Sequence, residues 1–225
     1  MDADIPRSQA EADAAAGAAI YTRAFLAIYD PLVTHFSSRF IWKCPSRLQV
    51  AFYNENVSAR HLDVGVGTGY FLDKCRFPSA TPTIGLMDLN PNSLAVTARR
   101  IRRYHPLTFK ANVLEPLQIN APQFDSIGLN YLLHCLPGDL HSKGVVFRNL
   151  KPLLNEGGVI FGTTILGVDA RHGWLARHLI PRYNAMKTFT NAQDSSDDLE
   201  QTLRTEFRTY SLRVVGSVAL FVGRV

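Results

Sequence analysis

Three glycines at alternate positions follow directly on a short apolar segment near residue 60. The stretch HLDVGVGTGY, residues 61–70, contains Gly65, Gly67 and Gly69, with Asp63 two positions before the first of them. Because glycine has no Cβ, alternate glycines let the backbone turn sharply and come close to a ligand. Such a turn also presents the free N–H groups of the helix that follows. The stretch therefore predicts a strand, a ligand-binding loop and a helix in immediate succession.

The rest of the chain predicts further strands that alternate with helices. Asn90 followed by Pro91 is a strong helix start, because asparagine caps a helix and proline fits its first position. Segment 124–130 is almost wholly apolar, as expected of a strand buried on both faces. We predict strands at 61–64, 83–88, 107–110, 124–130, 159–166, 209–215 and 217–222, helices at 46–53, 70–77, from Asn90, at 142–154 and at about 195–207, and a break at Gly157-Gly158.

Short connections between strands and helices favour a mostly parallel sheet with helices on both faces. Only Gly216 separates the last two predicted strands, which suggests an antiparallel pair at the sheet edge. No repeat or linker divides the 225 residues, so we predict one α/β domain over 1–225. Within it we expect a disordered tail at about 1–15, an N-terminal helical cap at about 16–57, a core at about 60–225 and, inside that core, an insertion at about 167–191.

Composition and charge narrow the classes of function. The net charge of +5 is only mildly basic, and its densest cluster, residues 99–103, is interpreted as the solvated face of one helix. The three cysteines show no CxxC pair, which argues against a disulfide framework or a zinc site. We find neither a signal peptide nor an apolar stretch of about 20 residues, so we expect a cytoplasmic protein without a membrane span.

The spacing of the glycines discriminates between two classes of nucleotide ligand. Dinucleotide-binding loops follow the pattern GxGxxG, but Tyr70 stands where that pattern needs its last glycine. Asp63 is an anion, which is awkward beside a pyrophosphate and suits a cationic ligand. The loop is therefore not typical of a nicotinamide dehydrogenase.

These residues resemble the motifs of the class I methyltransferases that use S-adenosylmethionine (SAM). LDVGVGTGYFL is similar to the first motif, IGLMDLNPNSL to the second, FKANVLEPL to the third and FDSIGLNYLLHCLPG to the fourth. LKPLLNEGGVIFGTTI resembles the helix, Gly-Gly and strand that follow. The resemblance covers roughly residues 60–225. It implies a Rossmann-like, mostly parallel seven-stranded sheet with an antiparallel C-terminal strand, and it implies SAM as methyl donor with S-adenosylhomocysteine (SAH) as product.

The same resemblance implies a set of cofactor-binding residues. Asp63 and the glycines would hold the methionine end, and the Asp88 carboxylate would accept both ribose hydroxyls. Asp88 could instead only adjoin a helix cap, and Asn112, which stands where the family usually has Asp, could be an ordinary turn residue. The implied cofactor residues are Asp63, Gly65, Gly67, Gly69, Asp88, Leu89 against the adenine, Asn112 and Val113 at its edge, Asn130 beside the methionine amine, and Tyr29.

Candidate residues on the acceptor side are fewer. His134 follows the strand 124–130 and could remove a proton from an acceptor, or it could be a packed, hydrogen-bonded side chain. Tyr29 belongs to an aromatic stripe at helical spacing that could face the sulfonium or form a helix core. The candidate catalytic residues are His134 and Tyr29, and the candidate substrate-binding residues are Tyr21, Phe25, His134, Trp174 and Tyr183, with Phe189 in the same insertion.

The sequence thus predicts a SAM-dependent methyltransferase acting on a small, aromatic or otherwise apolar molecule, in specialised metabolism. We find no acidic cluster for a divalent metal, and no NPPY-like tetrapeptide after the fourth strand, so a metal cofactor and a nucleic-acid acceptor are not expected. Two alternatives remain open: an RNA or tRNA methyltransferase that uses the arginines of 99–103, and a catalytically inactive SAM-binding partner subunit. The oligomeric state and the acceptor atom are not predicted.

Overall fold

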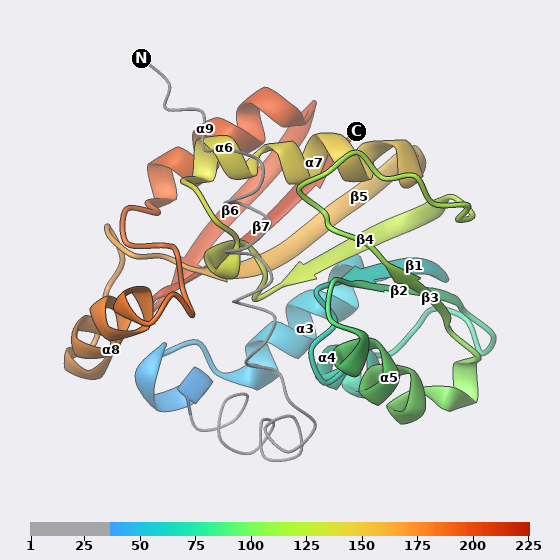
Figure 1. The fold of residues 1–225 in the computed structure, drawn as a ribbon, viewed down its shortest axis with the longest axis horizontal. Coiled ribbons are helices and arrows are strands. Elements are labelled where there is room, and N and C mark those ends of the chain that lie inside the picture. The colour runs from blue at the N-terminus through green and yellow to red at the C-terminus, as the bar shows by residue number, and fades with distance from the viewer. Residues whose placement is uncertain (1–36) are drawn as a thin grey trace.

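The described strands form one twisted sheet in the order β3-β2-β1-β4-β5-β7-β6 (Figure 1). In the computed structural model, residues 37–225 are described. Strands β1 to β5 pair in parallel, and β7 is antiparallel to both of its neighbours. The strands are β1 Arg60–Val64, β2 Thr83–Asp88, β3 Leu107–Lys110, β4 Phe124–Asn130, β5 Leu154–Ile165, β6 Thr209–Val215 and β7 Val218–Arg224. The predicted mostly parallel sheet with an antiparallel C-terminal strand is therefore confirmed.

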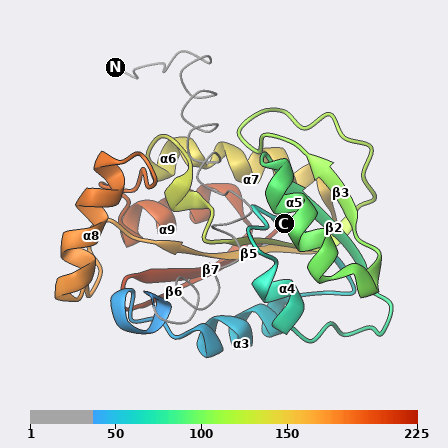
Figure 2. The ribbon, with the colours of Figure 1, turned by 60° about the horizontal axis from the view of Figure 1, so that its bottom comes forward.

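Helices cover both faces of this sheet (Figures 1 and 2). Helices α3, α4, α5 and α8 contribute to the apolar core on one face, and α6, α7 and α9 to the core on the other. The helices are α3 Ser46–Asn56, α4 Tyr70–Lys74, α5 Pro91–Arg100, α6 Leu140–Lys143, α7 Val145–Leu150, α8 Trp174–Ala185 and α9 Ser196–Glu206, with 3-10 turns η2 Arg102–Tyr104, η3 Leu133–Cys135 and η4 Lys151–Leu153.

The alternation of side chains along β1 assigns its residues to the two faces. Leu62 and Val64 belong to the core beneath α6, α7 and α9. His61 and Asp63 alternate with these two residues along the strand and so point to the opposite face. There the hydroxyl of Tyr53 in α3 bonds to both side chains. A two-residue period in a strand produces this division. It places two polar side chains of one strand inside the same buried layer.

The order of the strands also locates the edge at which a ligand can bind. In a parallel sheet the crevice lies outside the carboxyl ends of the strands, where the chain order reverses. Here that reversal falls between β1 and β4, which lie side by side. The glycine loop, residues 65–69, leaves the end of β1, and Asn130 ends β4. The sequence motifs therefore converge on one end of the sheet.

Two predicted boundaries were wrong around the Gly-Gly pair. The helix predicted over 142–154 is divided at Gly144 into α6 and α7 and is followed by η4. Strand β5 begins at Leu154, ahead of the glycines, where the prediction began it at Val159. Gly157 adopts a φ of 74°, and the β4–β5 register shifts between Phe124 and Ser126. The Gly-Gly pair therefore lies at an irregularity inside one long strand. The predicted break was wrong here because a β-bulge uses a positive φ as readily as a turn does.

Smaller differences affect the helices on either side of the glycine loop. Helix α4 ends at Lys74 instead of continuing to 77, because Cys75 is extended. Helix α3 continues to Asn56, beyond the predicted end at 53. Of the predicted N-terminal cap, residues 37–41 form a π turn that precedes α3. The predicted tail, Tyr21, Phe25 and Tyr29 lie outside the described residues.

Candidate active site

The glycine loop has the conformation that its sequence predicts. Gly65, Gly67 and Gly69 have φ values of 70°, 52° and 73°, in the region that L-residues rarely adopt. A Cβ at Gly65 would approach Leu132 Cδ1 to 2.8 Å, and one at Gly69 would approach Thr97 Cγ2 to 2.7 Å. A Cβ at Gly67 would meet no atom within 4 Å. Two of the glycines therefore permit close packing, whereas the third leaves open space beside the loop.

Asp88 ends β2 and faces this loop. Its carboxylate accepts a hydrogen bond from the Asn90 N–H at 2.8 Å and further bonds from the backbone N–H groups of Gly67 and Val66. Burial raises the pKa of Asp88 to about 6, against the lowering effect of these N–H donors. At neutral pH the group is thus ionised and can accept hydroxyl donors. Asn90 caps α5 through the N–H of Asn92, as its sequence position predicts.

Asn112 and Val113 lie at the far side of the same crevice. The Asn112 side chain accepts from the Leu114 N–H at 3.2 Å and donates to Glu115, which is the geometry of an Asx turn. Val113 is buried, and its carbonyl accepts from Asn149. The structure thus assigns Asn112 a turn role while it also lines the crevice.

Asn130 carries a buried hydrogen-bond donor that residues 37–225 leave unsatisfied. Its Oδ1 accepts from the Thr163 hydroxyl at 3.3 Å, but its Nδ2 has no partner within residues 37–225. The next residue, Tyr131, has a φ of 57°, and its N–H donates to the Thr163 carbonyl at 2.7 Å. A buried donor without a partner is rare in native proteins. Its position in the lining of the crevice fits a ligand that offers an acceptor.

The crevice is a continuous cavity of about 270 Å³ at the carboxyl ends of β1, β2 and β4. It joins the acidic and glycine-rich region to an aromatic region beyond β4. Its lining includes the predicted cofactor residues Asp63, Gly65, Gly67, Asp88, Leu89, Asn112, Val113 and Asn130. Gly69 is not among the lining residues, since it packs against Thr97.

The aromatic region of the cavity is a wall of five rings. We call the residues Trp42, Tyr131, His134, Tyr183 and Phe189 the aromatic wall, and all of them line the cavity. The Phe189 ring lies 4.6 Å from that of His134, 4.9 Å from that of Tyr183 and 5.9 Å from that of Trp42, measured between centroids. Such offset and edge-to-face pairs are favourable beyond their buried area. The wall combines residues from three distant parts of the sequence.

His134 is buried within this wall, with only 3% of its surface exposed. Its Nδ1 lies 3.4 Å from both the Ile165 N–H and the Thr164 hydroxyl. Because the Ile165 N–H can only donate, Nδ1 accepts, and the neutral ring carries its hydrogen on Nε2. Burial, helped by the charge of Lys143, lowers the pKa of His134 to about 3. The ring is therefore neutral at physiological pH, which favours the packed, hydrogen-bonded alternative over a strong general base.

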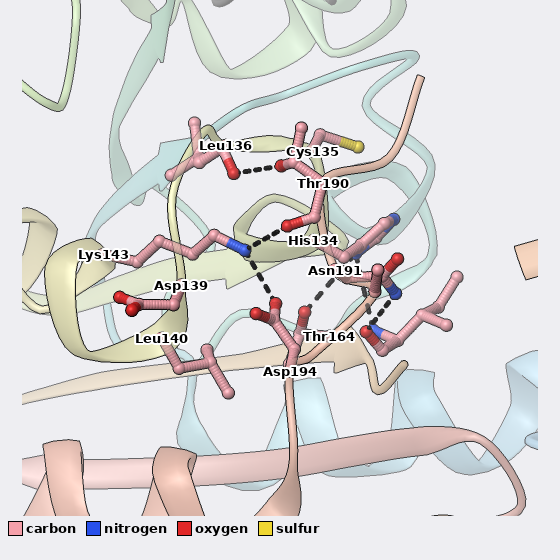
Figure 3. A network of polar contacts seen from close by, with 12 residues as sticks. His134, Cys135, Leu136, Asp139, Leu140, Lys143, Thr164, Thr190, Asn191 and Asp194 are labelled. Atoms are coloured by element: carbon pink, nitrogen blue, oxygen red, sulfur yellow. Dashed lines mark hydrogen bonds and ion pairs between the residues drawn. The ribbon is translucent and has the colours of Figure 1, made fainter. Parts of the chain in front are cut away.

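A buried polar network holds the segment that carries Phe189 (Figure 3). The Lys143 ammonium donates to the Asp194 carboxylate at 2.7 Å and to the Thr190 carbonyl at 3.0 Å. The Thr190 N–H in turn donates to the His134 carbonyl at 2.8 Å. Asn191 donates to the Ile165 carbonyl at the end of β5. These bonds fix the end of the 167–191 insertion against η3 and so fix one side of the aromatic wall.

Burial shifts both members of the Lys143–Asp194 pair. It lowers the pKa of Lys143 and raises that of Asp194 to about 6, while their mutual attraction acts in the opposite direction on each. Both side chains are almost fully buried. A pair of this kind is stabilised when further hydrogen bonds satisfy its charges, and here Lys143 also donates to the Thr190 carbonyl.

Not every predicted substrate-binding residue reaches the cavity. Tyr183 does, but Trp174 is 70% exposed at the start of α8 and is not part of the lining. Nine residues, about two and a half helical turns, separate the two residues and place them on opposite sides of α8, with Trp174 toward solvent. Tyr21, Phe25 and Tyr29 are not described.

Sequence reasoning missed many members of the lining, among them three large aromatic residues. Tyr131, Trp42 and Phe71 line the cavity, but none was assigned to it. Phe71 follows the glycine loop at a position that reads as an ordinary helix residue. Trp42 and Tyr131 reach the cavity only through the tertiary fold, so no local signal marks them.

Two kinds of feature are absent from the described residues. No group of three or more His, Cys, Asp or Glu side chains is arranged to hold a metal ion in the part of the chain from 37 to 225. No helix in that same part is both long and apolar enough to cross a membrane.

Comparison with known proteins identifies the family. A model described as a methyltransferase domain matches residues 62–160. The chain is 41% identical over 209 residues to demethylluteothin O-methyltransferase of Streptomyces thioluteus, and the alignment covers 91% of this chain and 89% of that protein. The chain belongs to the class I SAM-dependent methyltransferases. The methyltransferase is also 34% identical over 208 residues to the physcion biosynthesis cluster O-methyltransferase of Aspergillus chevalieri, covering 91% of this chain and 93% of the other.

A solved structure agrees with this assignment at the level of the fold. The N-methyltransferase NodS of Bradyrhizobium japonicum, in complex with SAH, superposes with a TM-score of 0.55 at 15% identity. The superposition covers 80% of this chain and 86% of NodS. The enzyme uses SAM as its methyl donor, as the sequence motifs predicted.

Proposed function

We propose that this methyltransferase transfers the methyl group of SAM to a phenolic or similarly acidic hydroxyl of a small, flat, apolar molecule. The observation that carries the proposal is the aromatic wall, which adjoins the acidic, glycine-rich half of one cavity. Flat apolar ligands stack on such rings. The named O-methyltransferase relatives support oxygen as the acceptor atom and specialised metabolism as the setting.

The cofactor half of the proposal assigns roles to residues around the glycine loop. Asp63 receives the ammonium of the methionine end, Asp88 the two ribose hydroxyls, and Asn130 Nδ2 an acceptor of the ligand. Leu89, Asn112 and Val113 border the adenine. The support is chemical: two carboxylates, an unsatisfied donor and the open space at Gly67 match the groups of SAM. When bound, SAM supplies a methyl group on a sulfonium for in-line displacement.

The acceptor half of the proposal follows from the state of His134. A ring with a pKa of about 3 is a weak base, so the site favours an acceptor hydroxyl that ionises readily. Phenols and enols meet this condition, whereas aliphatic alcohols do not. His134 then orients the acceptor oxygen through its Nε2–H, and the aromatic wall excludes water and fixes the ring. Tyr29 as a catalytic residue and a cytoplasmic location stay predictions.

The arginines of 99–103 do not favour the RNA alternative. Arg100 and Arg103 both pair with the Asp73 carboxylate, at 3.3 and 2.9 Å. Two of the four basic side chains are thus engaged within the protein, which agrees with their interpretation as a helix face. A phosphate-binding surface needs such charges available to the nucleic acid.

A matched acceptor panel tests the proposal. The enzyme is incubated with SAM and with an aromatic ring that bears a phenol, an amine or a hydroxymethyl group, and SAH formation is measured by mass spectrometry. We expect turnover of the phenol, at least ten-fold above the other two. Preference for the amine or the aliphatic alcohol would contradict the proposal. His134→Gln should lower phenol turnover, and His178→Gln, which alters an exposed histidine of α8, serves as control.

A further inference from the structure

A buried chain of hydrogen bonds runs from Asp63 toward the opposite end of the sheet. The Tyr53 hydroxyl lies 3.1 Å from Asp63 Oδ1 and 2.7 Å from His61 Nε2. His61 Nδ1 lies 2.8 Å from the Ser126 hydroxyl, which lies 2.7 Å from the Ser58 hydroxyl. Tyr53, His61 and Ser126 are fully buried. The chain thus connects α3, β1 and β4 beneath the cofactor half of the cavity.

Both ends of this chain can only accept hydrogen bonds. At one end the Tyr53 hydroxyl donates its one hydrogen to the Asp63 carboxylate at 3.1 Å. At the other end the Ser58 hydroxyl donates to the Arg60 carbonyl at 2.8 Å and has no second hydrogen. Each interior hydroxyl also has one hydrogen. With the two outer bonds kept, the direction of every inner bond is determined from the ends inward.

These directions meet at His61. Because the Tyr53 hydroxyl donates its only hydrogen to Asp63, it can only accept a hydrogen bond from His61 Nε2. Ser126 must donate to Ser58, so it can only accept from His61 Nδ1. The Ser58 N–H, which donates to Ser126 at 2.9 Å, fits the same arrangement because Ser126 keeps an acceptor site. Five contacts need five hydrogens, and a neutral histidine leaves the chain one short.

We propose that His61 is a buried imidazolium and the counter-ion of Asp63, with Tyr53 as the bridge between them. His61 and Tyr53 are then positioning residues, since they hold the carboxylate ionised and aimed at the cavity. The inference deepens the proposed function, because it rests on Asp63 receiving the ammonium of the methionine end of SAM.

The surroundings of His61 are compatible with a charged ring. Its Nε2 lies 3.7 Å from Asp63 Oδ1, within ion-pair distance. Burial raises the pKa of Tyr53 well above its usual value and that of the nearby Cys75 to about 12, so both stay neutral. Among residues 37–225, Tyr53 and Cys75 are thus neutral neighbours of this chain, and a second carboxylate, Asp88 of β2, acts on Asp63 from the cavity side. A buried ion pair persists when its hydrogen-bonding groups are satisfied, as they are here.

One other assignment satisfies all five contacts. If Asp63 were a carboxylic acid, its hydrogen would pass to Tyr53, Tyr53 would donate to His61 Nε2, and His61 would carry a hydrogen only on Nδ1. The cavity would then offer a neutral acid to a cationic ligand. The number of hydrogens on the His61 ring therefore decides between the two assignments.

Nitrogen-15 NMR of histidine-labelled full-length enzyme at pH 7 gives this number directly, with His61→Gln to assign the signals. We expect both ring nitrogens of His61 to carry a hydrogen. A single protonated ring nitrogen would overturn the proposal. The measurement needs no cofactor, so its result is independent of whether the proposed cofactor site is correct.

Calorimetric titration with SAH tests the positioning role. Tyr53→Phe removes the bridge, and we expect at least ten-fold weaker SAH binding. Tyr210→Phe is the matched control, since the Tyr210 hydroxyl bonds to Glu200 far from the cavity, and it should bind within two-fold of wild type. Equal binding by Tyr53→Phe would overturn the positioning role. No binding by folded wild type would instead refute the proposed cofactor site.

Tyr53 is fully buried, so its variant could fail to fold. His61→Gln then serves as the second variant, since glutamine keeps a donor toward Tyr53 but removes the positive charge. We expect it to fold and to bind SAH more weakly than wild type at pH 7, whereas binding equal to or tighter than that of wild type would contradict a counter-ion role.

Discussion

Replacing Asp88 by asparagine should make the enzyme more stable and a poorer binder of its cofactor. Burial raises the pKa of this carboxyl from 3.8 to about 6, so ionising it costs more in the folded chain than in the unfolded one. At about 1.4 kcal/mol for each pKa unit, the shift lowers the free energy of unfolding by about 3 kcal/mol. Asparagine has nearly the same shape, carries no charge and therefore avoids this cost.

The sign of the effect determines its pH dependence. Below pH 3.8 the carboxyl is protonated in both the folded and the unfolded chain, so its ionisation costs the folded state no stability. Above about pH 6 it is ionised in both states and the full penalty is present. Wild type therefore loses stability relative to Asp88→Asn as the pH rises from 4 to 7. The raised pKa already includes the N–H donors that favour the ionised carboxyl, so the pH-dependent difference needs no separate correction for these bonds.

Urea unfolding of both proteins at pH 4 and pH 7.5 measures this difference. We expect the advantage of Asp88→Asn over wild type in free energy of unfolding to be about 3 kcal/mol larger at pH 7.5 than at pH 4. Asp139→Asn is the control, because hydrogen bonds from Ser142 lower the pKa of that carboxyl below 3.8, so its difference from wild type should change little between pH 4 and pH 7.5. A difference for Asp88→Asn that is as independent of pH as that of the control, or that falls as the pH rises, would refute the reasoning.

The same variant should lose affinity for SAH. A neutral amide offers one acceptor where the carboxylate offers two, and charge-assisted bonds contribute about 1.5–3 kcal/mol each. Calorimetry at pH 7.5 should therefore show SAH binding weakened by about ten- to hundred-fold. A stabilised variant with unchanged affinity would mean that Asp88 is not the ribose acceptor. The predicted combination, higher stability with lower affinity, is typical of a functional group held at a cost to the fold.

Three further changes test other parts of the structure. Gly69→Ala should destabilise the enzyme by about 1–3 kcal/mol, seen in its urea midpoint, because its φ is positive and its Cβ would clash with Thr97. Lys143→Met should cost about 3–5 kcal/mol in the same assay by leaving Asp194 buried without its cation, and adding Asp194→Leu should recover part of it. Phe189→Ala should raise the acceptor KM at least ten-fold while SAH affinity stays within two-fold; loss of both would show that the aromatic wall is not specific to the acceptor.

Much of the cofactor half could be predicted from sequence because its signals are local. The glycines need positive φ, Asn90 needs to cap a helix, and Asp88 ends a strand; each requirement acts within a few residues. Neighbouring strands then bring these positions together without further information. The error at Gly157 has the same origin, because positive φ serves a bulge as well as a turn.

The acceptor half could not be predicted in the same way, because tertiary contacts assemble it. Trp174 and Phe189 looked equivalent in the insertion, yet one is exposed and the other packs on His134. What separates them is the Lys143–Asp194 pair, which joins residues 51 positions apart and fixes the end of the insertion. A charged pair at that separation has no local sequence signature.

The chain beneath Asp63 shows how the two kinds of information combine. The alternation along β1 predicts that His61 and Asp63 share a face, since both lie one position out of step with Leu62. It does not predict that Tyr53 and Ser126 would close the chain from α3 and β4. Once those contacts are known, valence restricts the hydrogens to two arrangements, which differ in the number on the proposed His61 imidazolium ring. The protonation of His61 is therefore a property that neither the strand pattern nor the glycine motif carries, and it follows only from the packed structure.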